Sequence, residues 1–369
     1  MKKIIHIITG LGNGGAEHML YKLIKYSDKT RFYHEVISLM DEGVYGCKIN
    51  ALGVKVHCLN INRSTGNIIF PLLKARHIAK KFDIVSTWLY HADIFGFIIA
   101  KVLLRKKLIW NIRHSNLDKN ANKPTTLKIV RLNSFLSRAV NLITYNSNRA
   151  LENHLGIGYS AQNAVVIPNG FELDKFQFNM EDRLRVREKL KLGEVKTIIT
   201  VGRWDVQKDY YTLLKALNEV RKKTTSFKMI MVGANLDYAN DELVALIEKY
   251  NLKDNIILLG IHNNIPALLA AADIYVSSSL GESFSNAIGE AMACELPCIV
   301  TDVGDSKLIV EDTGKVVNAG DYISMAEAML TYLNANPLFR NFAGRQRIKK
   351  EFEISKIAAK FEGYFDSLI

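Results

Sequence analysis

The chain has 369 residues, of which 48% are hydrophobic and 23% are charged, with 23 glycines and 6 prolines. This composition is typical of a folded globular protein of two or three domains, and it excludes a collagenous, low-complexity or intrinsically disordered chain. The four cysteines are too few and too scattered for a disulfide framework.

The net charge of +12 is unevenly distributed. Residues 1–168 contain 24 Lys and Arg against 9 Asp and Glu, a net charge of +15, whereas the remaining residues contain 25 against 28, a net charge of −3. A basic first half favours an anionic partner, either nucleic acid or an anionic membrane surface. A basic face that contacts only solvent would give the same distribution.

Short runs rich in Val and Ile alternate with helical patterns of 10 to 16 residues along the chain. The first run follows two lysines, as in a signal peptide, but it is short and leads into glycine-rich sequence, so we interpret it as a buried strand. The apolar stretch 94–104 is interrupted by Lys101 and is too short to span a bilayer. Strands are expected at residues 3–9, 35–39, 54–58, 83–87, 107–112, 141–144, 164–167, 197–202, 227–232, 255–259, 273–277 and 297–301.

Continuous apolar strands that are followed by amphipathic helices indicate parallel sheets covered on both faces, so the fold class is α/β. Twelve strands are too many for one open sheet, and the turn sequence Pro168-Asn169-Gly170 separates two series. We expect two doubly wound, Rossmann-like domains, residues 1–168 and 169–350, which face each other across a ligand cleft. Residues 351–369 carry a narrow apolar stripe at helical spacing and are expected to form a helix docked on the protein.

In the glycine-rich loop after the first expected strand, Gly14 and Gly15 would let backbone amides approach an anionic or hydroxylated ligand. The loop is only a weak match to a dinucleotide-binding fingerprint. Two further candidate segments, Trp88-Leu89-Tyr90-His91 and Asn111-Ile112-Arg113-His114, lie at the ends of expected strands, where side chains face the ligand crevice. A purely structural role for either histidine stays open.

Arg203 follows the strand expected at residues 197–202, and Lys208 comes five residues later. Two cations near one strand end suit a diphosphate, which a guanidinium binds through two hydrogen bonds and an ammonium group binds as a point charge. Each could instead be an ordinary solvated charge. A phosphate-binding helix start at a neighbouring strand strengthens the diphosphate interpretation.

That helix start follows the strand expected at residues 273–277, in the sequence Glu282-Ser283-Phe284-Ser285-Asn286. Ser285 or Asn286 can cap a helix that runs to about residue 293, and the amides at such a helix start attract phosphate. Glu282 precedes the cap and can reach a ligand at the helix tip, whereas Glu290 lies within the helix. A capping glutamate and a solvated glutamate would give the same pattern.

These motifs together resemble the retaining glycosyltransferases of family 4, which have the GT-B fold. The resemblance rests on Gly14-Gly15-Ala16-Glu17, on Gly202-Arg203 with Lys208, and on Glu282 followed by Glu290. It extends to Ile167-Pro168-Asn169-Gly170 and Asp302-Val303-Gly304-Asp305, and so covers nearly the whole chain. The segments around His91 and His114 are similar to the branch that builds O-antigen or capsule repeats.

The resemblance implies that residues 1–168 bind the acceptor and residues 169–350 bind a nucleotide sugar. It implies that Arg203 and Lys208 clamp the donor diphosphate, that Glu282 contacts the sugar hydroxyls and that Glu290 contacts the ribose. His114 would lie beside the donor sugar, although His91 competes for that place. The other implied positions are Gly14, Gly15, Ser283, Phe284, Ser285 and Asn286 on the donor side and Tyr90, His91 and Arg113 on the acceptor side. Asp209, Ser283 and Glu295 depart from the family pattern, because glycine is common at these three positions.

The implied reaction is a retaining sugar transfer from a nucleoside-diphosphate sugar, most simply a UDP-sugar, to a glycan acceptor on a polyprenyl diphosphate, in bacterial surface polysaccharide synthesis. No cofactor is expected, and the absence of an Asp-x-Asp triplet argues against a bound divalent metal. We expect a cytoplasmic enzyme at the inner face of the membrane, with Lys101, Arg105, Lys106 and Lys107 along one helix end facing an anionic leaflet. The alternatives are a non-hydrolysing nucleotide-sugar epimerase and a nucleic-acid-binding protein, although nucleic acid is not the expected partner.

Overall fold

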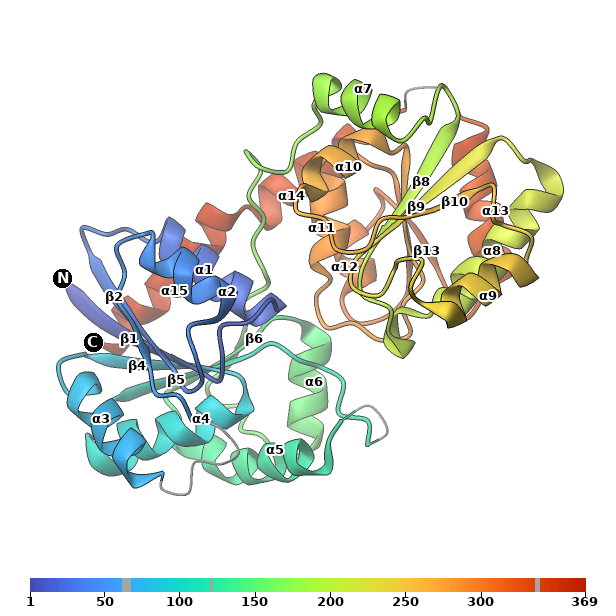
Figure 1. Ribbon diagram of the computed structural model, residues 1–369. Helices are drawn as coiled ribbons and strands as arrows, with labels where there is room; N and C mark the ends of the chain where they lie inside the picture. Colours follow the sequence, from blue (N-terminus) through green and yellow to red (C-terminus); the bar gives the residue numbers. More distant parts are fainter. Residues whose placement is uncertain (62–67, 120–121, 336–338) are drawn as a thin grey trace. The chain divides into compact units, whose positions relative to one another are not determined.

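The computed structural model describes residues 1–61, 68–119, 122–335 and 339–369, which form two compact units (Figure 1). Unit 1 comprises Met1–Gly170 and Ile354–Ile369, and unit 2 comprises Phe171–Glu353. Each unit contains one parallel sheet with helices on its faces, so the predicted α/β class is confirmed.

Unit 1 has a seven-stranded sheet in the order β3-β2-β1-β4-β5-β6-β7. All its neighbouring strands pair in parallel. The order reverses between β1 and β4, and ligands of doubly wound sheets bind at such a switch point, beyond the carboxyl ends of the strands. The strands are β1 (Lys2–Ile8), β2 (Phe32–Ser38), β3 (Val56–Cys58), β4 (Ile84–Trp88), β5 (Lys107–Ile112), β6 (Leu142–Tyr145) and β7 (Ala164–Val166).

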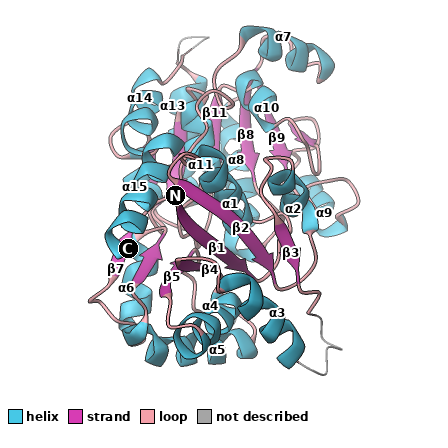
Figure 2. Ribbon diagram, turned by 90° about the vertical axis from the view of Figure 1, so that its left-hand side faces the viewer, coloured by secondary structure: helices cyan, strands magenta, loops and turns pink. Residues whose placement is uncertain are grey.

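Helices of unit 1 form a layer on each face of this sheet (Figures 1 and 2). On one face, α1, α2 and the last helix, α15, share an apolar core with Ile4 and Ile8 of β1. On the other face, α3 to α6 pack against Ile5 and Ile7 of the same strand, as the alternation of side chains along a strand requires. The helices are α1 (Gly15–Tyr26), α2 (Gly43–Asn50), α3 (Ile69–Ala79), α4 (Tyr90–Phe97), α5 (Pro124–Leu136), α6 (Asn148–Gly156) and α15 (Ile354–Leu368), with a π-helix, η1 (Ile98–Leu103), after α4 and a short 3-10 turn, η2 (Ser137–Ala139), after α5.

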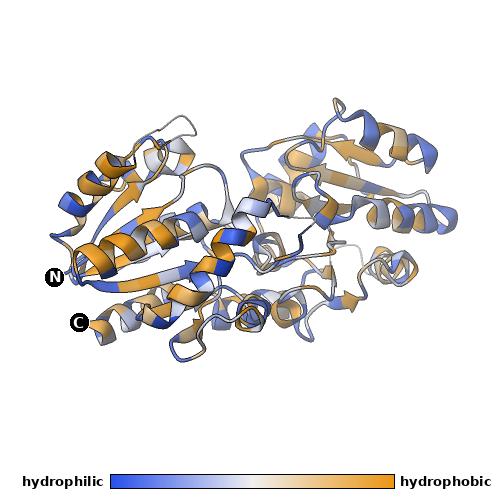
Figure 3. Cartoon of the chain, turned by 90° about the horizontal axis from the view of Figure 1, so that it is seen from below, coloured by the Kyte–Doolittle hydropathy of each residue, from blue (hydrophilic) through white to orange (hydrophobic). Residues whose placement is uncertain are grey.

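Unit 2 has a six-stranded sheet in the order β10-β9-β8-β11-β12-β13, with its switch point between β8 and β11. The strands are β8 (Lys196–Val201), β9 (Phe227–Val232), β10 (Ile256–Leu258), β11 (Ile274–Ser277), β12 (Cys298–Thr301) and β13 (Lys315–Val317). Strand β13 was not predicted, because only Val316 and Val317 are apolar between Lys315 and Asn318, whereas the other three-residue strands lie in longer apolar patterns. The strands are mainly hydrophobic, whereas hydrophobic and hydrophilic residues alternate around the helices (Figure 3).

Side-chain caps set the first residue of most helices in unit 2. Asn179, Asp209, Asn240, Asn264, Asp321 and Asn341 each accept a hydrogen bond from a backbone amide of the first turn. The helices are α7 (Met180–Lys189), α8 (Tyr210–Lys223), α9 (Asp241–Lys249), α10 (Ile265–Ala271), α11 (Asn286–Ala293), α12 (Ser306–Val310), α13 (Tyr322–Leu333) and α14 (Phe342–Glu351), with a 3-10 turn, η3 (Val206–Lys208), before α8. In the described part of the chain, every helix is too short or too polar to span a bilayer.

Candidate functional site

The two donor motifs of the sequence meet at the switch point of unit 2. Strands β8 and β11 are paired neighbours. The loop after β8 carries Arg203 and Lys208, and the loop after β11 carries Glu282. Because parallel strands end at the same edge of the sheet, these three side chains lie at the place where an α/β unit binds its ligand.

Lys208 and Glu282 form an ion pair between these loops, with Lys208 Nζ donating to Glu282 Oε1. The same carboxylate oxygen accepts a hydrogen bond from Ser279 Oγ at 2.8 Å. Ser278 Oγ donates to the Lys208 carbonyl at 2.8 Å, which ties the loops together through a second contact. Both charged side chains are largely buried, so their mutual attraction is screened less than that of a surface pair.

Arg203 is more accessible, with 63% of its side chain exposed. Its Nε donates to Asp205 Oδ2 at 2.9 Å, and Asp205 Oδ1 accepts the Gln207 amide at 2.9 Å. The carboxylate of Asp205 therefore orients the guanidinium from one side. The exposed remainder of the guanidinium has donors that can bind a phosphate through paired hydrogen bonds.

The backbone around Arg203 is held tightly. The Trp204 amide donates to the Ala234 carbonyl at 2.8 Å, and the Trp204 ring stacks on Tyr210 with 5.4 Å between the ring centroids. Gly233 has φ +145°, and a Cβ atom there would lie 1.8 Å from the Gly202 carbonyl oxygen. Only glycine fits this approach, so the packing of the neighbouring loop fixes the position of Arg203.

The loop after β11 is anchored on both sides of Glu282. Phe284 is buried against the rings of Phe171 and Phe352, with centroid distances of 6.1 and 5.4 Å. Gly304 has φ +55°, and a Cβ atom there would lie 2.4 Å from the Glu282 carbonyl oxygen. The predicted helix follows as α11, whose N-cap residue, Ser285, makes no side-chain hydrogen bond to the helix amides. The amides of the first turn are thus not occupied by that cap.

The remaining donor-side predictions in unit 2 also belong to this loop and helix, whereas Gly14 and Gly15 lie at the start of α1 in unit 1. Ser283 and Asn286 flank Phe284 and Ser285, and Glu290 lies partly buried on α11. Two of the three departures from the family pattern have left-handed backbones, with φ +48° at Asp209 and φ +63° at Glu295. Their backbones are thus in the region that favours the glycine of the family pattern.

The acceptor motifs surround the switch point of unit 1. Gly14 is the N-cap residue of α1, and a Cβ atom at Gly14 would lie 2.3 Å from Glu17 Oε2; Gly15 begins the helix. The loop after β4 begins at Leu89, whose φ of +74° and ψ of +147° are sparsely populated for a residue with a side chain. Strained backbone of this kind occurs often at functional sites.

The four acceptor-motif side chains differ in accessibility. His91 is exposed and His114 is partly buried. The Tyr90 hydroxyl is buried and hydrogen-bonds to His154 Nε2 at 2.9 Å. Arg113 Nη1 donates to the Ile167 carbonyl at 3.0 Å, and its guanidinium lies over the Trp88 and Phe361 rings.

The Tyr90 hydroxyl and Arg113 Nη1 thus bind partners inside unit 1, whereas Nε and Nη2 of Arg113 are buried and have no hydrogen-bond partner among the described residues. Burial also lowers the pKa of Arg113 to about 9. An acceptor role for these two side chains stays a prediction, and His91 is the exposed side chain of the four.

The four cations expected along one helix end are arranged differently. Lys101 lies in η1 and donates to Asn141 Oδ1 at 2.6 Å, Arg105 has a left-handed backbone with φ +53°, and Lys107 begins β5. The helical part ends at Leu103, so the interpretation of one helix end was wrong. With Asp83 and Asn141, the four cations line a hollow of about 460 Å³.

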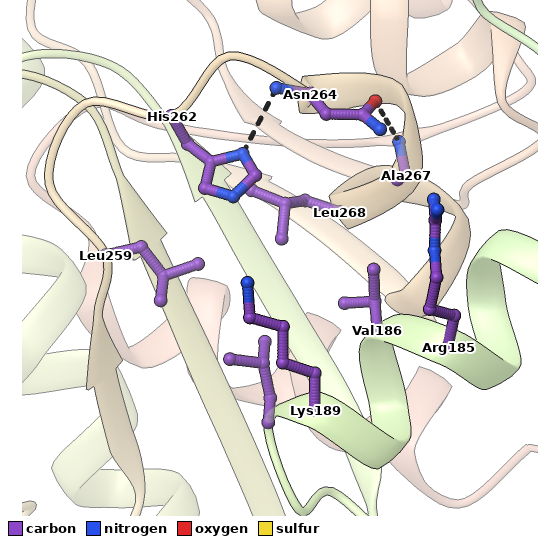
Figure 4. Close-up of a pocket in the computed structure, with 9 residues that line it drawn as sticks. Arg185, Val186, Lys189, Leu259, His262, Asn264, Ala267 and Leu268 are labelled. Carbon is purple, nitrogen blue, oxygen red and sulfur yellow. Dashed lines mark hydrogen bonds between the residues drawn. The ribbon is translucent and has the colours of Figure 1, made fainter.

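A second hollow, of about 320 Å³, lies in unit 2 away from the motif residues (Figure 4). Val186 and Leu268 contribute apolar surface from α7 and α10, and Arg185, Lys189 and His262 add polar groups. None of the predicted site residues lines this hollow. Among the described residues, no group of three or more His, Cys, Asp or Glu side chains is arranged to hold a metal ion.

Sequence reasoning missed the polar residues that orient the predicted ones. Ser278 and Ser279 support Lys208 and Glu282, and Asp205 supports Arg203. The run Ser277-Ser278-Ser279 at the end of an apolar strand was a signal that could have pointed to them.

Two family models match the sequence. The model described as Glycosyltransferase Family 4 matches residues 13–175, and the model described as Glycosyl transferases group 1 matches residues 195–335. Together they cover more than half of the chain.

Characterised proteins and solved structures give similar results. Over 97% of its length the chain is 24% identical to N-acetylgalactosamine-N,N'-diacetylbacillosaminyl-diphospho-undecaprenol 4-alpha-N-acetylgalactosaminyltransferase of Campylobacter jejuni, of which it covers 98%. Over 87% it is 26% identical to UDP-Gal:alpha-D-GlcNAc-diphosphoundecaprenol alpha-1,3-galactosyltransferase of Escherichia coli, of which it covers 84%. The fold matches HepE of Anabaena in complex with UDP-glucose, with a TM-score of 0.86, 22% identity and complete coverage of both chains.

Proposed function

The chain belongs to the family 4 glycosyltransferases with the GT-B fold, and from this membership we propose that it transfers a sugar from a UDP-sugar to a glycan carried on a polyprenyl diphosphate. The observation that carries the donor half of the proposal is the meeting of Arg203, Lys208 and Glu282 at the switch point of unit 2. Neither the family models nor the named relatives support an epimerase or a nucleic-acid-binding protein.

The charges at this switch point suit a nucleoside diphosphate. Arg203 would bind the phosphates through its exposed guanidinium, and Lys208 would add a second positive charge. Glu282 accepts hydrogen bonds, so it suits sugar hydroxyls and not phosphates. Glu290, on the helix that follows, is assigned to the ribose.

In the proposed reaction, the bond between the anomeric carbon and the diphosphate oxygen breaks while the acceptor oxygen bonds to that carbon from the same face. The proton of the acceptor hydroxyl passes to an oxygen of the departing diphosphate. Negative charge accumulates on the diphosphate in the transition state, where Arg203, Lys208 and the first amides of α11 would stabilise it. Retention follows from attack on the face that the leaving group vacates.

The assignment of a UDP-sugar is supported by the names of similar proteins. The Escherichia coli relative is named for UDP-Gal, and HepE was solved with UDP-glucose. The relatives from Escherichia coli and Campylobacter jejuni are both named for acceptors on diphospho-undecaprenol. We assign the glycan acceptor of this chain to the same chemical class.

A lipid-linked acceptor would place the enzyme at the cytoplasmic face of a membrane. The net charge of +15 in residues 1–168 supports contact with an anionic leaflet, because each Lys or Arg near such a surface contributes about 1 kcal/mol. The hollow lined by Lys101, Arg105, Lys106 and Lys107 belongs to this basic part of the chain.

A transfer assay tests the proposal directly. The purified chain is incubated with UDP-, GDP- and ADP-sugars and with a short glycan on a farnesyl or undecaprenyl diphosphate, and the product is analysed by NMR. We expect transfer from a UDP-sugar with retention of the anomeric configuration. Isomerised donor in the absence of acceptor would instead indicate an epimerase, and an inverted product would contradict the family mechanism.

A further inference from the structure

The outer side of α3 exposes large apolar side chains at its beginning. Ile69, Phe70 and Leu73 are exposed to 61, 72 and 54%, respectively. Monomeric proteins seldom leave several such side chains together in contact with water, and such a patch often marks an interaction site.

The register of the helix explains why these side chains cannot reach the core. Pro71, Ala75 and Ala79 are spaced four residues apart and are buried, so they define the side of α3 that packs on unit 1. Phe70 and Leu73 project from the opposite side. The exposed side continues with Arg76 and His77, and the exposed Lys80 and Lys81 follow the helix. We refer to Ile69, Phe70, Leu73, Arg76, His77, Lys80 and Lys81 as the outer face of α3.

The charge of this segment is of one sign. From residue 68 to residue 82 the sequence contains four Lys and Arg and no acidic residue. The neighbouring π-helix η1, which packs against α3, exposes Val102 to 64% and carries Lys101. Both α3 and η1 thus carry exposed apolar side chains and lysine or arginine residues, and both belong to the helix layer that packs on Ile5 and Ile7 of β1.

We infer that the outer face of α3 is the surface with which unit 1 binds an anionic lipid bilayer. Ile69, Phe70 and Leu73 enter the boundary between headgroups and acyl chains. Arg76, Lys80 and Lys81 stay at the level of the lipid phosphates, as in helices that lie in a membrane interface. This inference rests on the proposed function in one respect. The enzyme needs a membrane because the proposed acceptor is attached to a lipid carrier.

A bilayer fits this face better than a protein partner. A protein would need apolar pockets for three neighbouring side chains and an acidic rim opposite the cations. An anionic leaflet offers both the apolar layer and the negative charge in one surface, without a fixed arrangement of pockets. The net positive charge of the whole first half acts in the same direction.

Vesicle flotation of the full chain tests the inference. The wild type is mixed at low salt with vesicles of phosphatidylcholine alone or with 30% phosphatidylglycerol, and bound protein is measured. The double variant Phe70→Ser/Leu73→Ser should lower partitioning to the anionic vesicles at least tenfold, because it removes the side chains that enter the bilayer. Phe342→Ser is the matched control: it removes a phenylalanine exposed to 65% on α14 of unit 2, and its binding should equal that of the wild type.

A second measurement reports on α3 directly. In Phe70→Trp, anionic vesicles should shift the emission of the new tryptophan to shorter wavelength relative to the wild-type signal. Absence of this shift, wild-type partitioning of Phe70→Ser/Leu73→Ser, or equal wild-type binding to neutral vesicles would each overturn the inference. So would a wild-type dimer that the double variant dissociates, because a second copy of the chain would then occupy the face.

The failure of this inference can be distinguished from failure of the proposed function. The double variant should transfer sugar to a short water-soluble acceptor at the wild-type rate, because α3 lies outside the predicted site. Loss of vesicle binding with intact transfer supports both proposals. If the double variant transfers sugar and still binds vesicles like the wild type, only the inference about the outer face of α3 is rejected. If vesicle binding depends on Phe70 but neither the wild type nor any variant transfers sugar, only the proposed reaction is rejected.

Discussion

Lys208 and Glu282, 74 positions apart in the sequence, form an ion pair between the loops that follow β8 and β11. In the proposed complex these two groups have different ligands, because the ammonium faces phosphate and the carboxylate faces sugar hydroxyls. In the structure each group holds the other in position. Binding of the donor would therefore exchange charged contacts for new ones and would not require the loops to be rebuilt.

The first prediction concerns the two cations. Arg203→Ala and Lys208→Ala should each lower kcat/KM by about 10² or more, roughly 3 kcal/mol, because each removes positive charge from the departing diphosphate. Lys222→Ala is the control, since Lys222 lies on the surface of α8 and pairs only with Glu219 among the described residues. Wild-type kcat/KM in both site variants would refute the assignment of Arg203 and Lys208 to the donor diphosphate.

The same two variants should differ in stability. Arg203 is largely exposed, so its removal should leave the urea unfolding midpoint nearly unchanged. Lys208→Ala leaves the largely buried carboxylate of Glu282 without its cation, which should lower the free energy of unfolding by about 1 kcal/mol. The double variant Lys208→Ala/Glu282→Ala should recover part of that loss.

The second prediction separates the two glutamates. Glu282→Ala should mainly lower kcat, because its proposed contact is with the reacting sugar. Glu290→Ala should mainly raise the dissociation constant of free UDP, because its proposed contact is with the ribose. Calorimetric titration with UDP and steady-state kinetics measure the two effects, and equal loss of UDP affinity in both variants would show that the roles are wrongly divided.

The third prediction uses two glycines with similar backbones. Gly304 and Gly320 both have positive φ, +55° and +78°, but only at Gly304 would a Cβ atom collide, at 2.4 Å from the Glu282 carbonyl oxygen. Gly304→Ala should therefore displace the loop that holds Glu282 and lower kcat/KM at least tenfold. Gly320→Ala introduces comparable backbone strain without that contact and should cost only about 1 kcal/mol of stability, with kcat/KM unchanged. Equal activity of the two variants would refute the close approach.

Much of the fold could be predicted from local sequence. Twelve strands are detectable because each lies in an apolar pattern between amphipathic helices, whereas β13 has only two adjacent apolar residues, Val316 and Val317, and gives no such signal. β2 begins at Phe32, three residues before its expected start. The prediction began too late because histidine is a polar residue, whereas His34 is buried in the structure. The strand ends then locate the loops that carry Arg203 and Glu282 and the first turn of α4, which carries His91.

Contacts between distant segments could not be predicted in the same way. Nothing near Lys208 in the sequence indicates Glu282 or Ser279 as its neighbours, and nothing near Arg113 indicates the Ile167 carbonyl. The interpretation of Lys101 and Lys107 as one helix end was wrong because local pattern does not show where a π-helix stops and β5 begins. Periodicity locates elements, whereas the contacts of long polar side chains depend on tertiary packing.

The fourth prediction concerns metals. With two cations proposed for the phosphates and no Asp-x-Asp triplet in the sequence, transfer should keep most of its rate in excess EDTA. The control reaction contains EDTA saturated with magnesium. A rate that EDTA abolishes and manganese or magnesium restores would contradict the prediction.

The fifth prediction follows from a chain of hydrogen bonds in unit 1. Trp88 Nε1 donates to His6 Nδ1 at 3.2 Å, so His6 carries its proton on Nε2 and donates to His34 Nδ1 at 3.0 Å. His34 Nε2 donates to Ser27 Oγ at 2.9 Å, and Ser27 Oγ donates to Glu362 at 2.8 Å. The chain links β4, β1 and β2 to α15, and it requires both imidazoles to be neutral.

Acid should therefore destabilise unit 1. Burial lowers the pKa of His34 to about 4 and also holds the pKa of His6 well below 6.5, with a further decrease from His34. In the unfolded chain His6 and His34 take up protons near pH 6.5, whereas in the folded unit they do not. The stabilising contribution of the two neutral histidines is therefore present above pH 6.5 and is lost as the pH falls from 6.5 towards 4. The slope for one histidine approaches about 1.4 kcal/mol per pH unit.

Urea unfolding between pH 5 and 8, followed by the fluorescence of the buried Trp88 and Trp110, measures this dependence. His34→Gln should reduce the slope of the free energy of unfolding between pH 5 and 6.5, because one proton-linked group is removed. His77→Gln, at an exposed position on α3, should keep the wild-type slope. A wild-type stability that is constant or rises from pH 6.5 to 5 would show that the two histidines are not held neutral in the folded unit.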